Sequence, residues 1–322
     1  MLVYAAIYEN EIREKSSSGG IFSLLASQFD VVYGVAMTKD NYECEVIRIE
    51  GDISPLRGSK YFQARVGESF KLVKKDLEEG KTVLYSGTGC QINGLKLYLR
   101  KDYSNLFLVD IICHGTPSPK LWREYVKYYE CKYGKLEYVN FRCKVNSWKN
   151  VGMKRNELYI SKDDDWFMQM FLRDYCLRPS CYKCHAKKYK MADITIADFW
   201  GIENIAPEMN DDRGTSLVII RSDKGKKMFD SVKSDLRWKE VSYEDAVKGN
   251  PSEYSSVKRP VQRDYFFRDL EQYGVKRTAK KYVDVSFSIK RKIKSTIKNN
   301  IQRGSDKEGN ENYGILLKFK GK

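Results

Sequence analysis

Three of the eight cysteines lie within nine residues, at Cys176, Cys181 and Cys184, and His185 follows directly. The spacing Cys-x4-Cys-x2-Cys occurs in iron–sulfur proteins, in which thiolates from one loop hold part of a cluster and a distant cysteine completes it. Cys181 and Cys184 also match half of a zinc ribbon, and with His185 they match a c-type haem attachment sequence. A disulfide or unliganded thiols are the remaining alternatives. The loop therefore predicts metal chemistry and favours an iron–sulfur cluster.

The length and composition indicate a chain with its own core and reduced thiols. At 322 residues it can bury a substantial core without disulfides, which leaves its cysteines free for chemistry. Residues 1–30 contain no charged segment followed by an apolar run and a cleavage site, and no apolar run approaches about 18 residues. We therefore expect a cytoplasmic protein, in which thiols stay reduced. This expectation argues against haem attachment and favours a metal over a disulfide.

The net charge of +15 indicates an acidic partner or an anionic cofactor. Much of the excess lies in residues 287–322, which contain ten Lys or Arg and three Asp or Glu. Ile289, Ile293, Ile297 and Ile301 recur there every four residues among lysines, which predicts a basic amphipathic helix. Such a helix could contact a membrane surface, an acidic partner or the rest of the protein. Because the charge is concentrated in this tail and no recognition motif is present, we do not expect nucleic-acid binding.

The order of strands and helices predicts an α/β fold. A strand over 82–86, a glycine-rich turn, a helix over 92–99 and a strand over 106–112 form a βαβ unit. Its two strands should be parallel, so Cys90 and Cys113, which follow them, should lie at the same edge of the sheet. Open α/β sheets bind ligands at that edge. Two thiols that are distant in sequence should thus converge.

Further segments complete a mixed open sheet with flanking helices and a cysteine-rich loop. We predict additional strands over 2–8, 31–37, 44–49, 136–145, 152–160, 193–197 and 217–220, and helices over 21–26, 66–80, from 119, over 166–171 and over 224–236. Serines and paired glycines at 16–20 precede the first helix. They can hold an anion such as phosphate, or they can form an ordinary serine N-cap. The basic, hydroxyl-bearing loop over 56–63 could hold phosphate as well.

Six short segments stand out together: SSGG at 17–20, LRGSKY at 56–61, SGTGCQ at 86–91, CHG at 113–115, LRPSCYKC at 177–184 and DFWG at 198–201. In this order they resemble the beta subunit of coenzyme F420-reducing hydrogenase and F420-dependent dehydrogenases. The resemblance covers roughly residues 3–240. It implies a flavin and iron–sulfur domain over 1–245. After it we expect a C-terminal helical extension over 246–285 and a basic tail over 286–322.

The resemblance implies an oxidoreductase that binds FAD and a [4Fe–4S] cluster and passes electrons between them. Hydride would move to or from coenzyme F420 or another acceptor, because a flavin can collect single electrons and transfer them in pairs. Matched by position, the cluster ligands would be Cys90, Cys113, Cys181 and Cys184, with Cys176 as the alternative. The residues near FAD would be Ser17, Ser18, Gly19, Gly20, Ser59, Lys60, Tyr61, Thr88 and Asp198.

The chain departs from the family pattern in two ways. Family members often carry an N-terminal ferredoxin-like module, whereas no cysteine precedes Cys44 here. We therefore expect electrons to come from a separate donor protein such as a ferredoxin. Gly89 stands where the family usually has proline, which should loosen the turn before Cys90. Bacterial relatives also occur in organisms without F420, sometimes beside genes for surface-polysaccharide synthesis, so the small-molecule hydride acceptor stays open.

Two further hypotheses concern the histidines and the overall function. His114 is a candidate for proton transfer, although a hydrogen bond that holds its glycine turn is the favoured role. His185 is expected to support the metal ligands rather than to act in catalysis. The alternative function is a non-catalytic protein, stabilised by zinc or another metal, that docks on an anionic membrane or polymer through its basic tail.

Overall fold

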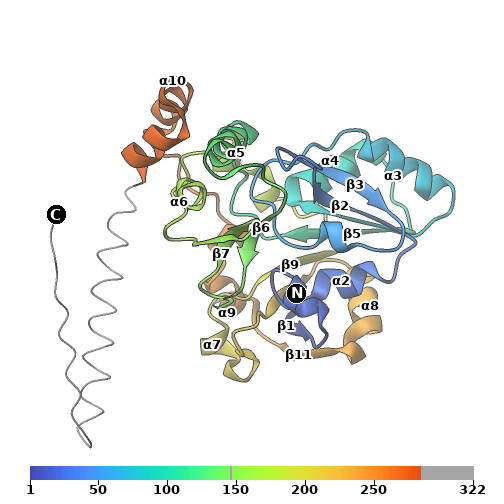
Figure 1. Cartoon of the computed structure of the whole chain (residues 1–322). Coiled ribbons are helices and arrows are strands. Elements are labelled where there is room, and N and C mark those ends of the chain that lie inside the picture. The colour runs from blue at the N-terminus through green and yellow to red at the C-terminus, as the bar shows by residue number, and fades with distance from the viewer. Residues whose placement is uncertain (146, 284–322) are drawn as a thin grey trace, which may run out of the picture. The chain divides into compact units, whose positions relative to one another are not determined.

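The fold is organised around a mixed sheet of eight strands (Figure 1). The computed structural model describes residues 1–145 and 147–283. Across the sheet the strands lie in the order β11 (Leu236–Glu240), β1 (Val3–Tyr8), β10 (Ser216–Ile220), β9 (Ile194–Asp198), β5 (Leu106–Ile111), β4 (Val83–Thr88), β2 (Val31–Met37) and β3 (Cys44–Ile49). The predicted α/β class and the mixed open sheet are therefore confirmed.

The centre of the sheet is parallel. Strands β2, β4, β5 and β9 run in one direction, and α4 (Gly89–Leu99) connects β4 to β5 as the predicted βαβ unit. Strand β1 has the same direction, because it pairs antiparallel with β10, which in turn pairs antiparallel with β9. Five strands therefore end at one edge of the sheet. Cys90 and Cys113 follow two of these strands, as predicted.

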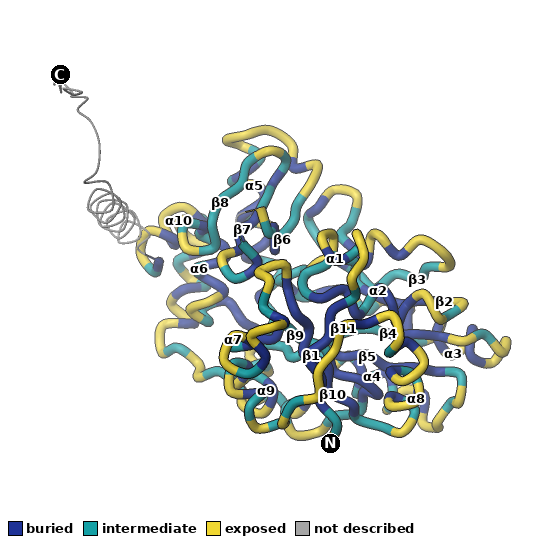
Figure 2. The backbone as a smooth tube through the Cα atoms, turned by 90° about the horizontal axis from the view of Figure 1, so that it is seen from below, coloured by how far each residue is buried: buried dark blue, intermediate teal, exposed yellow. Residues whose placement is uncertain are grey.

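Helices cover both faces of this sheet. On one face α2 (Ile21–Ala26) and α8 (Asp223–Val232) bury apolar side chains against the strands. On the other face α3 (Ser69–Glu78) and α4 cover β2, β4 and β5, while α7 (Ile202–Ile205) and α9 (Tyr243–Lys248) cover β1 and β10. Figure 2 shows the buried strands between more exposed helices and loops. The sheet is thus the middle of three layers, as expected for an α/β protein.

A second, antiparallel sheet lies in the chain between β5 and β9. It consists of β6 (Val139–Cys143), β7 (Gly152–Arg155) and β8 (Leu158–Ser161). These strands share an aromatic core with α5 (Pro119–Tyr133), α6 (Trp166–Leu172) and α10 (Arg263–Tyr282). Trp122 is the centre of this core, with ring contacts to Phe141 and Phe167. This unit supplies one wall of the site described below.

Several predicted elements differ from the structure. The helix predicted over 66–80 is shorter, at Ser69–Glu78, and the strand predicted over 136–145 is shorter, at Val139–Cys143. The strand predicted over 152–160 is a hairpin, because Asn156 turns the chain in the left-handed region with φ of 46°. The helix predicted over 224–236 ends at Val232, and residues from Leu236 form β11 because they pair with β1. The helix predicted from residue 92 already begins at Gly89, because Thr88 and Gln91 form a capping box there.

The described residues up to Val283 form one compact unit. The domain divisions at residues 245 and 285 stay predictions. The basic tail over 286–322, with its predicted amphipathic helix, lies outside the described residues. Within the described ranges, no helix has the length and apolar character needed to cross a membrane.

Candidate functional site

A cavity of about 680 Å³ opens at the edge where the parallel strands end. Its size is in the range of small-molecule and cofactor sites, and α/β sheets bind ligands at this edge. Most of the residues predicted to contact flavin line it, namely Ser17, Ser18, Gly20, Ser59, Lys60, Tyr61, Thr88 and Asp198. Cys90, Cys113 and His114 line it as well. The fold therefore gathers at one cavity residues that are far apart in the sequence.

The serine loop and the basic loop meet through their side chains. Ser17 Oγ lies 3.0 Å from Ser59 Oγ, which joins the two predicted flavin-binding loops. Ser18 Oγ donates a hydrogen bond of 2.8 Å to the carbonyl of Thr215, just before β10. The loop is thus held on one side by the sheet and on the other by residues 57–61.

Gly19 lies behind the cavity wall, at a position where there is no room for a side chain. A Cβ at this position would lie 2.5 Å from the carbonyl oxygen of Ala6 and 2.8 Å from the backbone nitrogen of Ser216. The Gly19 N–H donates to Ser216 Oγ at 3.0 Å. Gly20 follows in the left-handed region, with φ of 86°, at the N-cap of the six-residue helix α2. The paired glycines therefore let the serine loop approach the strands closely.

Lys60 places a half-buried positive charge at the cavity. Its Nζ donates to the carbonyls of Pro55 at 3.0 Å and Arg57 at 2.8 Å. No carboxylate of the described residues forms an ion pair with it. Burial therefore lowers the pKa of Lys60 to about 8. The neighbouring Tyr61 ring packs against Phe171 of α6, with 5.2 Å between the ring centroids.

Cys90 lies in the first turn of α4. Thr88 caps this helix, and the Cys90 Sγ lies 3.2 Å from Thr88 Oγ1. A Cβ at Gly89 would lie 3.2 Å from the Cβ of Ala186, which follows the cysteine loop. Gly89 therefore permits close packing between the start of α4 and the loop, whereas the sequence suggested only a looser turn. This packing brings Cys90 to the Cys181–Cys184 segment.

Backbone hydrogen bonds bring the cysteine loop to Cys113. The Ser118 N–H donates to the carbonyl of Cys176 at 2.8 Å, and the Arg178 N–H donates to the carbonyl of Thr116 at 2.9 Å. The Thr116 N–H also points at Cys181 Sγ, at 3.4 Å. Two short segments that are 60 residues apart thus run side by side, and an isolated antiparallel β-bridge joins Pro117 and Leu177.

The electrostatics show that the thiols share one environment. Burial raises the pKa of Cys113 to about 11; Lys187 lowers it, while the charges of Cys181 and Cys90 raise it further. The Lys187 ammonium contacts the carbonyls of Cys113 and Ser252. Burial lowers the pKa of Lys187, whereas the charges of Cys113 and Cys184 raise it. Lys187 therefore lies among the predicted ligands and offsets negative charge there.

The predicted cluster ligands come from three segments of the chain, Cys90, Cys113 and Cys181–Cys184. In the described ranges, no group of three or more His, Cys, Asp or Glu is placed so that it could hold a metal ion. A [4Fe–4S] cluster binds one thiolate at each of four corners. The donor types, thiols near the half-buried ammonium of Lys187, suit such a cluster. Each thiol would bind as a thiolate, and metal coordination would remove the proton that burial retains on Cys113.

Cys176 has a different environment. Its side chain is fully buried in the aromatic core, beside Leu177. Burial raises the pKa of its thiol far above the usual range. Of the eight cysteines, all of which the structure describes, Cys90 and Cys113 line the cavity, whereas Cys181, Cys184, Cys176, Cys44, Cys131 and Cys143 do not. The backbone hydrogen bond from Ser118 fixes the orientation of residue 176 toward the core.

The two histidines are placed differently. His114 lines the cavity, and its Nε2 lies 2.6 Å from Asp174 Oδ1. The edge of Phe171 packs against its ring at 5.4 Å. His185 is exposed at the start of a short 3-10 turn. The contact with Asp174 is consistent with a hydrogen bond that holds the turn, and the role of His114 stays a prediction.

Arg142 is a cavity residue that sequence reasoning missed. It lies in β6, and its Nε donates to the carbonyl of Ser17 at 3.1 Å. Its Nη2 lies 3.1 Å from Asp198 Oδ2. Burial raises the pKa of Asp198, while Arg142 lowers it. One indication of Arg142 was present in the sequence, a charged residue between Phe141 and Cys143 in a mostly apolar strand. The alternation of apolar and polar residues along a strand would, however, place its side chain in solvent.

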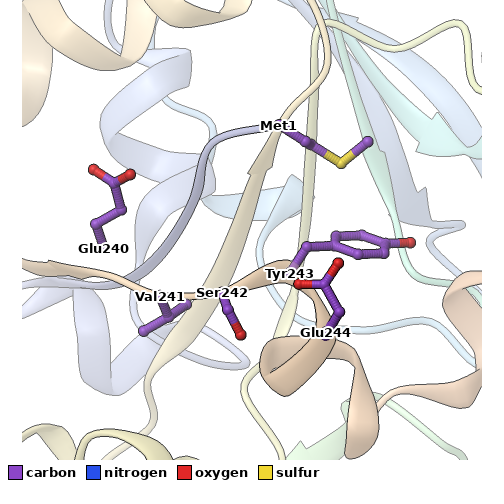
Figure 3. A pocket seen from close by; sticks show the side chains of 6 residues that line it. All are labelled: Met1, Glu240, Val241, Ser242, Tyr243 and Glu244. Carbon is purple, nitrogen blue, oxygen red and sulfur yellow. The ribbon is translucent and has the colours of Figure 1, made fainter.

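A second hollow lies at the opposite side of the sheet, around Met1 and the connection from β11 to α9 (Figure 3). Glu240, Ser242, Tyr243 and Glu244 line it. No cysteine and no basic residue of the described chain contributes to it. It therefore offers no redox or phosphate-binding chemistry comparable to that of the main cavity.

A family model for the C terminus of the coenzyme F420 hydrogenase/dehydrogenase beta subunit matches residues 80–246. This is more than half of the chain. The chain belongs to this family. The matched part includes Asp198 and the predicted cluster ligands, whereas the loops at 17–20 and 59–61 lie before it. No curated protein matches the chain.

A chain in the xenon-derivatized structure of the F420-reducing [NiFe] hydrogenase complex from Methanosarcina barkeri has a similar fold. The TM-score is 0.54, with 16% sequence identity, and the match covers 87% of this chain and 90% of that chain. At this identity the likeness shows the fold alone. The family membership identifies an oxidoreductase of the F420 hydrogenase beta-subunit type.

Proposed function

We propose that this family member is an iron–sulfur flavoprotein that passes electrons between a [4Fe–4S] cluster and FAD. Hydride would move to or from coenzyme F420 or another small-molecule acceptor. One observation supports the proposal: Cys90 and Cys113 line the cavity that the two predicted flavin-binding loops also line, and Cys181 Sγ lies 3.4 Å from the backbone nitrogen of Thr116, three residues after Cys113. The family assignment supports this combination of cofactors.

Each part of the site has a defined task in this proposal. Cys90, Cys113, Cys181 and Cys184 would hold the cluster, and Lys187 would offset the charge of the thiolates. The predicted flavin contacts at 17–20, 59–61 and 88, with Asp198, would bind FAD. When bound, the flavin supplies the conversion between single electrons and hydride. Apolar walls that include Val109 and Ile196 would keep water from the reacting atoms.

His114 is the candidate for holding or releasing a proton at the cavity. Because Nε2 contacts Asp174, any exchange would use Nδ1. Replacing His114 with asparagine should leave cofactor content unchanged. If the residue only supports its turn, the rate of flavin reduction should also stay within about threefold of the wild type, a difference below 1 kcal/mol.

The electron donor is proposed to be a separate, acidic protein such as a ferredoxin. Residues 175–192, around the cysteine loop, contain no Asp or Glu. Lys183, His185 and Lys188 are exposed there. A cluster that lies under a basic surface would receive an acidic partner by electrostatic attraction. We propose a cytoplasmic location, because the cysteines must remain reduced to bind iron.

Anaerobic purification tests the proposal. The expected protein is brown, contains about four irons and equal sulfide per chain, and releases FAD on denaturation. Replacing Cys90 with alanine should remove most of the iron, whereas replacing the exposed Cys131 of α5 should not. A colourless protein that contains zinc and no flavin would refute the proposal. It would favour the alternative, a metal-stabilised protein that binds an anionic membrane or polymer.

The acceptor can then be identified by turnover. The reduced protein is mixed with F420, with nicotinamide nucleotides or with a sugar-linked substrate, and flavin reoxidation is followed. Reoxidation by only one class assigns the acceptor, including a link to surface-polysaccharide synthesis in the third case.

A further inference from the structure

Arg142 is a buried cation with an unused hydrogen-bond donor at the cavity. Its side chain is 6% exposed, and it lines the cavity wall. The Nε atom donates to Ser17, and Nη2 lies 3.1 Å from Asp198 Oδ2, but without the orientation of a hydrogen bond. Within the described residues Nη2 has no hydrogen-bond partner. A buried donor without a partner is unfavourable, so an acceptor on a bound ligand would complete this arrangement.

The surroundings fix the direction of this donor. Trp148 and Trp200 stack on each other with 5.1 Å between their ring centroids. The guanidinium carbon lies 5.1 Å from the Trp200 centroid and 5.9 Å from that of Trp148. Asp198 and the Ser17 carbonyl hold the other side of the group. Arg142 is therefore oriented before any ligand binds, which reduces the entropy lost on binding.

The charge of the cavity selects the ligand chemistry. Its basic lining residues are Arg57, Lys60, Arg142, Lys149, Lys162 and Arg178, and its single acidic lining residue is Asp198. Asp198 pairs with Arg142 and Glu203 pairs with Lys149, so Arg57, Lys60, Lys162 and Arg178 give the lining its net positive charge. A guanidinium also has the planar, forked geometry that suits the two oxygens of a phosphate or carboxylate.

We propose that Arg142 forms an oxyanion-binding subsite and that Nη2 donates to a phosphate or carboxylate oxygen of the ligand in the cavity. The oxyanion could come from the diphosphate of FAD, and only in this case does the inference rest on the proposed function. The other source is an anionic group of the hydride acceptor. The two sources share the same chemistry and differ in which molecule loses affinity when Arg142 is replaced.

The test compares Arg142→Met and Arg142→Lys with Arg155→Lys in the full-length protein. Arg155 of β7 is a matched control, because it is also buried and pairs with Asp165 at 2.8 Å, but does not line the cavity. Inorganic pyrophosphate is the first probe, read as an increase in melting temperature. Dissociation constants for FAD and riboflavin are measured next, since riboflavin lacks phosphate.

Pyrophosphate should stabilise the wild type and Arg155→Lys, but not Arg142→Met. Arg142→Lys should retain part of the effect, because it keeps the charge and loses the fork. If the oxyanion is the FAD diphosphate, Arg142→Met should weaken FAD binding by about 10- to 100-fold and riboflavin binding by less than about threefold. If FAD affinity is unchanged, a selective rise in KM for an anionic acceptor assigns the subsite to that molecule.

Two results would overturn the inference. One is that pyrophosphate stabilises the wild type and both Arg142 variants equally, or stabilises none of them. The other is a parallel loss of FAD and riboflavin affinity, which would indicate that Arg142 only shapes the cavity. A wild type that binds no flavin would remove the proposed function, yet the pyrophosphate comparison would still decide the subsite. If Arg142→Met does not fold, Arg142→Lys against Arg155→Lys gives the same comparison.

Discussion

Replacing Gly19 with alanine tests how closely the serine loop approaches the sheet. The new Cβ would lie 2.5 Å from the carbonyl oxygen of Ala6 and 2.8 Å from the backbone nitrogen of Ser216. Both atoms belong to the paired interior strands β1 and β10, which cannot move without breaking their ladder. Overpacking of this kind costs about 1–3 kcal/mol. For a unit of this size the melting temperature should fall by about 2–5 °C.

Gly94→Ala is the matched control in the same protein. Gly94 lies inside α4, and a Cβ there would make an ordinary contact at 3.5 Å with the ring of Phe70. Alanine is the better helix former, so this variant should be more stable by about 0.5–1 kcal/mol. The two substitutions add the same atom and should shift stability in opposite directions.

Thermal unfolding and flavin titration together provide the assay. Relief of the clash would push the serine loop, with Ser17 and Ser18, toward the cavity, so Gly19→Ala should also bind FAD more weakly. Gly94→Ala should bind FAD as the wild type does. If Gly19→Ala melts at or above the wild-type temperature and retains its FAD affinity, the loop does not lie where the structure places it.

Other predictions concern charge and the thiols. Burial raises the pKa of Asp110 from 3.8 to about 6, so the folded state prefers the protonated form and loses stability as pH rises from about 4 to 6. Asp110→Asn should therefore be more stable than the wild type by up to about 3 kcal/mol at pH 7 and gain little at pH 4. Urea unfolding at both pH values measures this, and an equal gain at the two pH values would contradict it. Lys60 should lose its charge as pH rises through about 8, so the affinity for pyrophosphate or FAD should fall between about pH 7 and 9. In a titration series, Lys60→Met should lack this decrease in affinity. A decrease that persists in the variant would belong to another group. Cys113→Ala should lose most of its iron, whereas Cys176→Ala should keep its iron and lose about 1–2 kcal/mol of stability from the core. Iron analysis and unfolding experiments distinguish the two variants. Loss of iron from Cys176→Ala would show that this thiol is a ligand.

The central part of the fold could be predicted because its signals are local. The βαβ unit shows a strand, a glycine turn, an apolar helix and a strand in immediate succession, and chirality then requires the two strands to be parallel. Cys90 and Cys113 follow from this unit, because each comes directly after a strand. The position of both cysteines at one edge of the sheet could therefore be predicted without knowledge of distant contacts.

Elements that depend on distant partners could not be predicted in the same way. Residues 236–240 carry few buried side chains and form a strand only because β1 offers an unpaired edge. The orientation of Arg142 is likewise set by partners far away in sequence, since Ser17 and Asp198 come from two other parts of the chain. A pattern within β6 contains no information about either residue.

The cysteine loop shows how long-range pairing can change an inference from spacing. Spacing alone favours Cys176 as a ligand, because Cys-x4-Cys-x2-Cys matches a ferredoxin-type run. The strand-like pairing of Pro117 with Leu177 turns residue 176 toward the aromatic core and leaves Cys181 beside the Thr116 N–H. Cys176 is enclosed by the aromatic core, whereas Cys181 lies beside the segment that follows Cys113. The backbone partner of the loop, rather than the number of residues between its cysteines, therefore determines that the Cys176 side chain lies in the aromatic core.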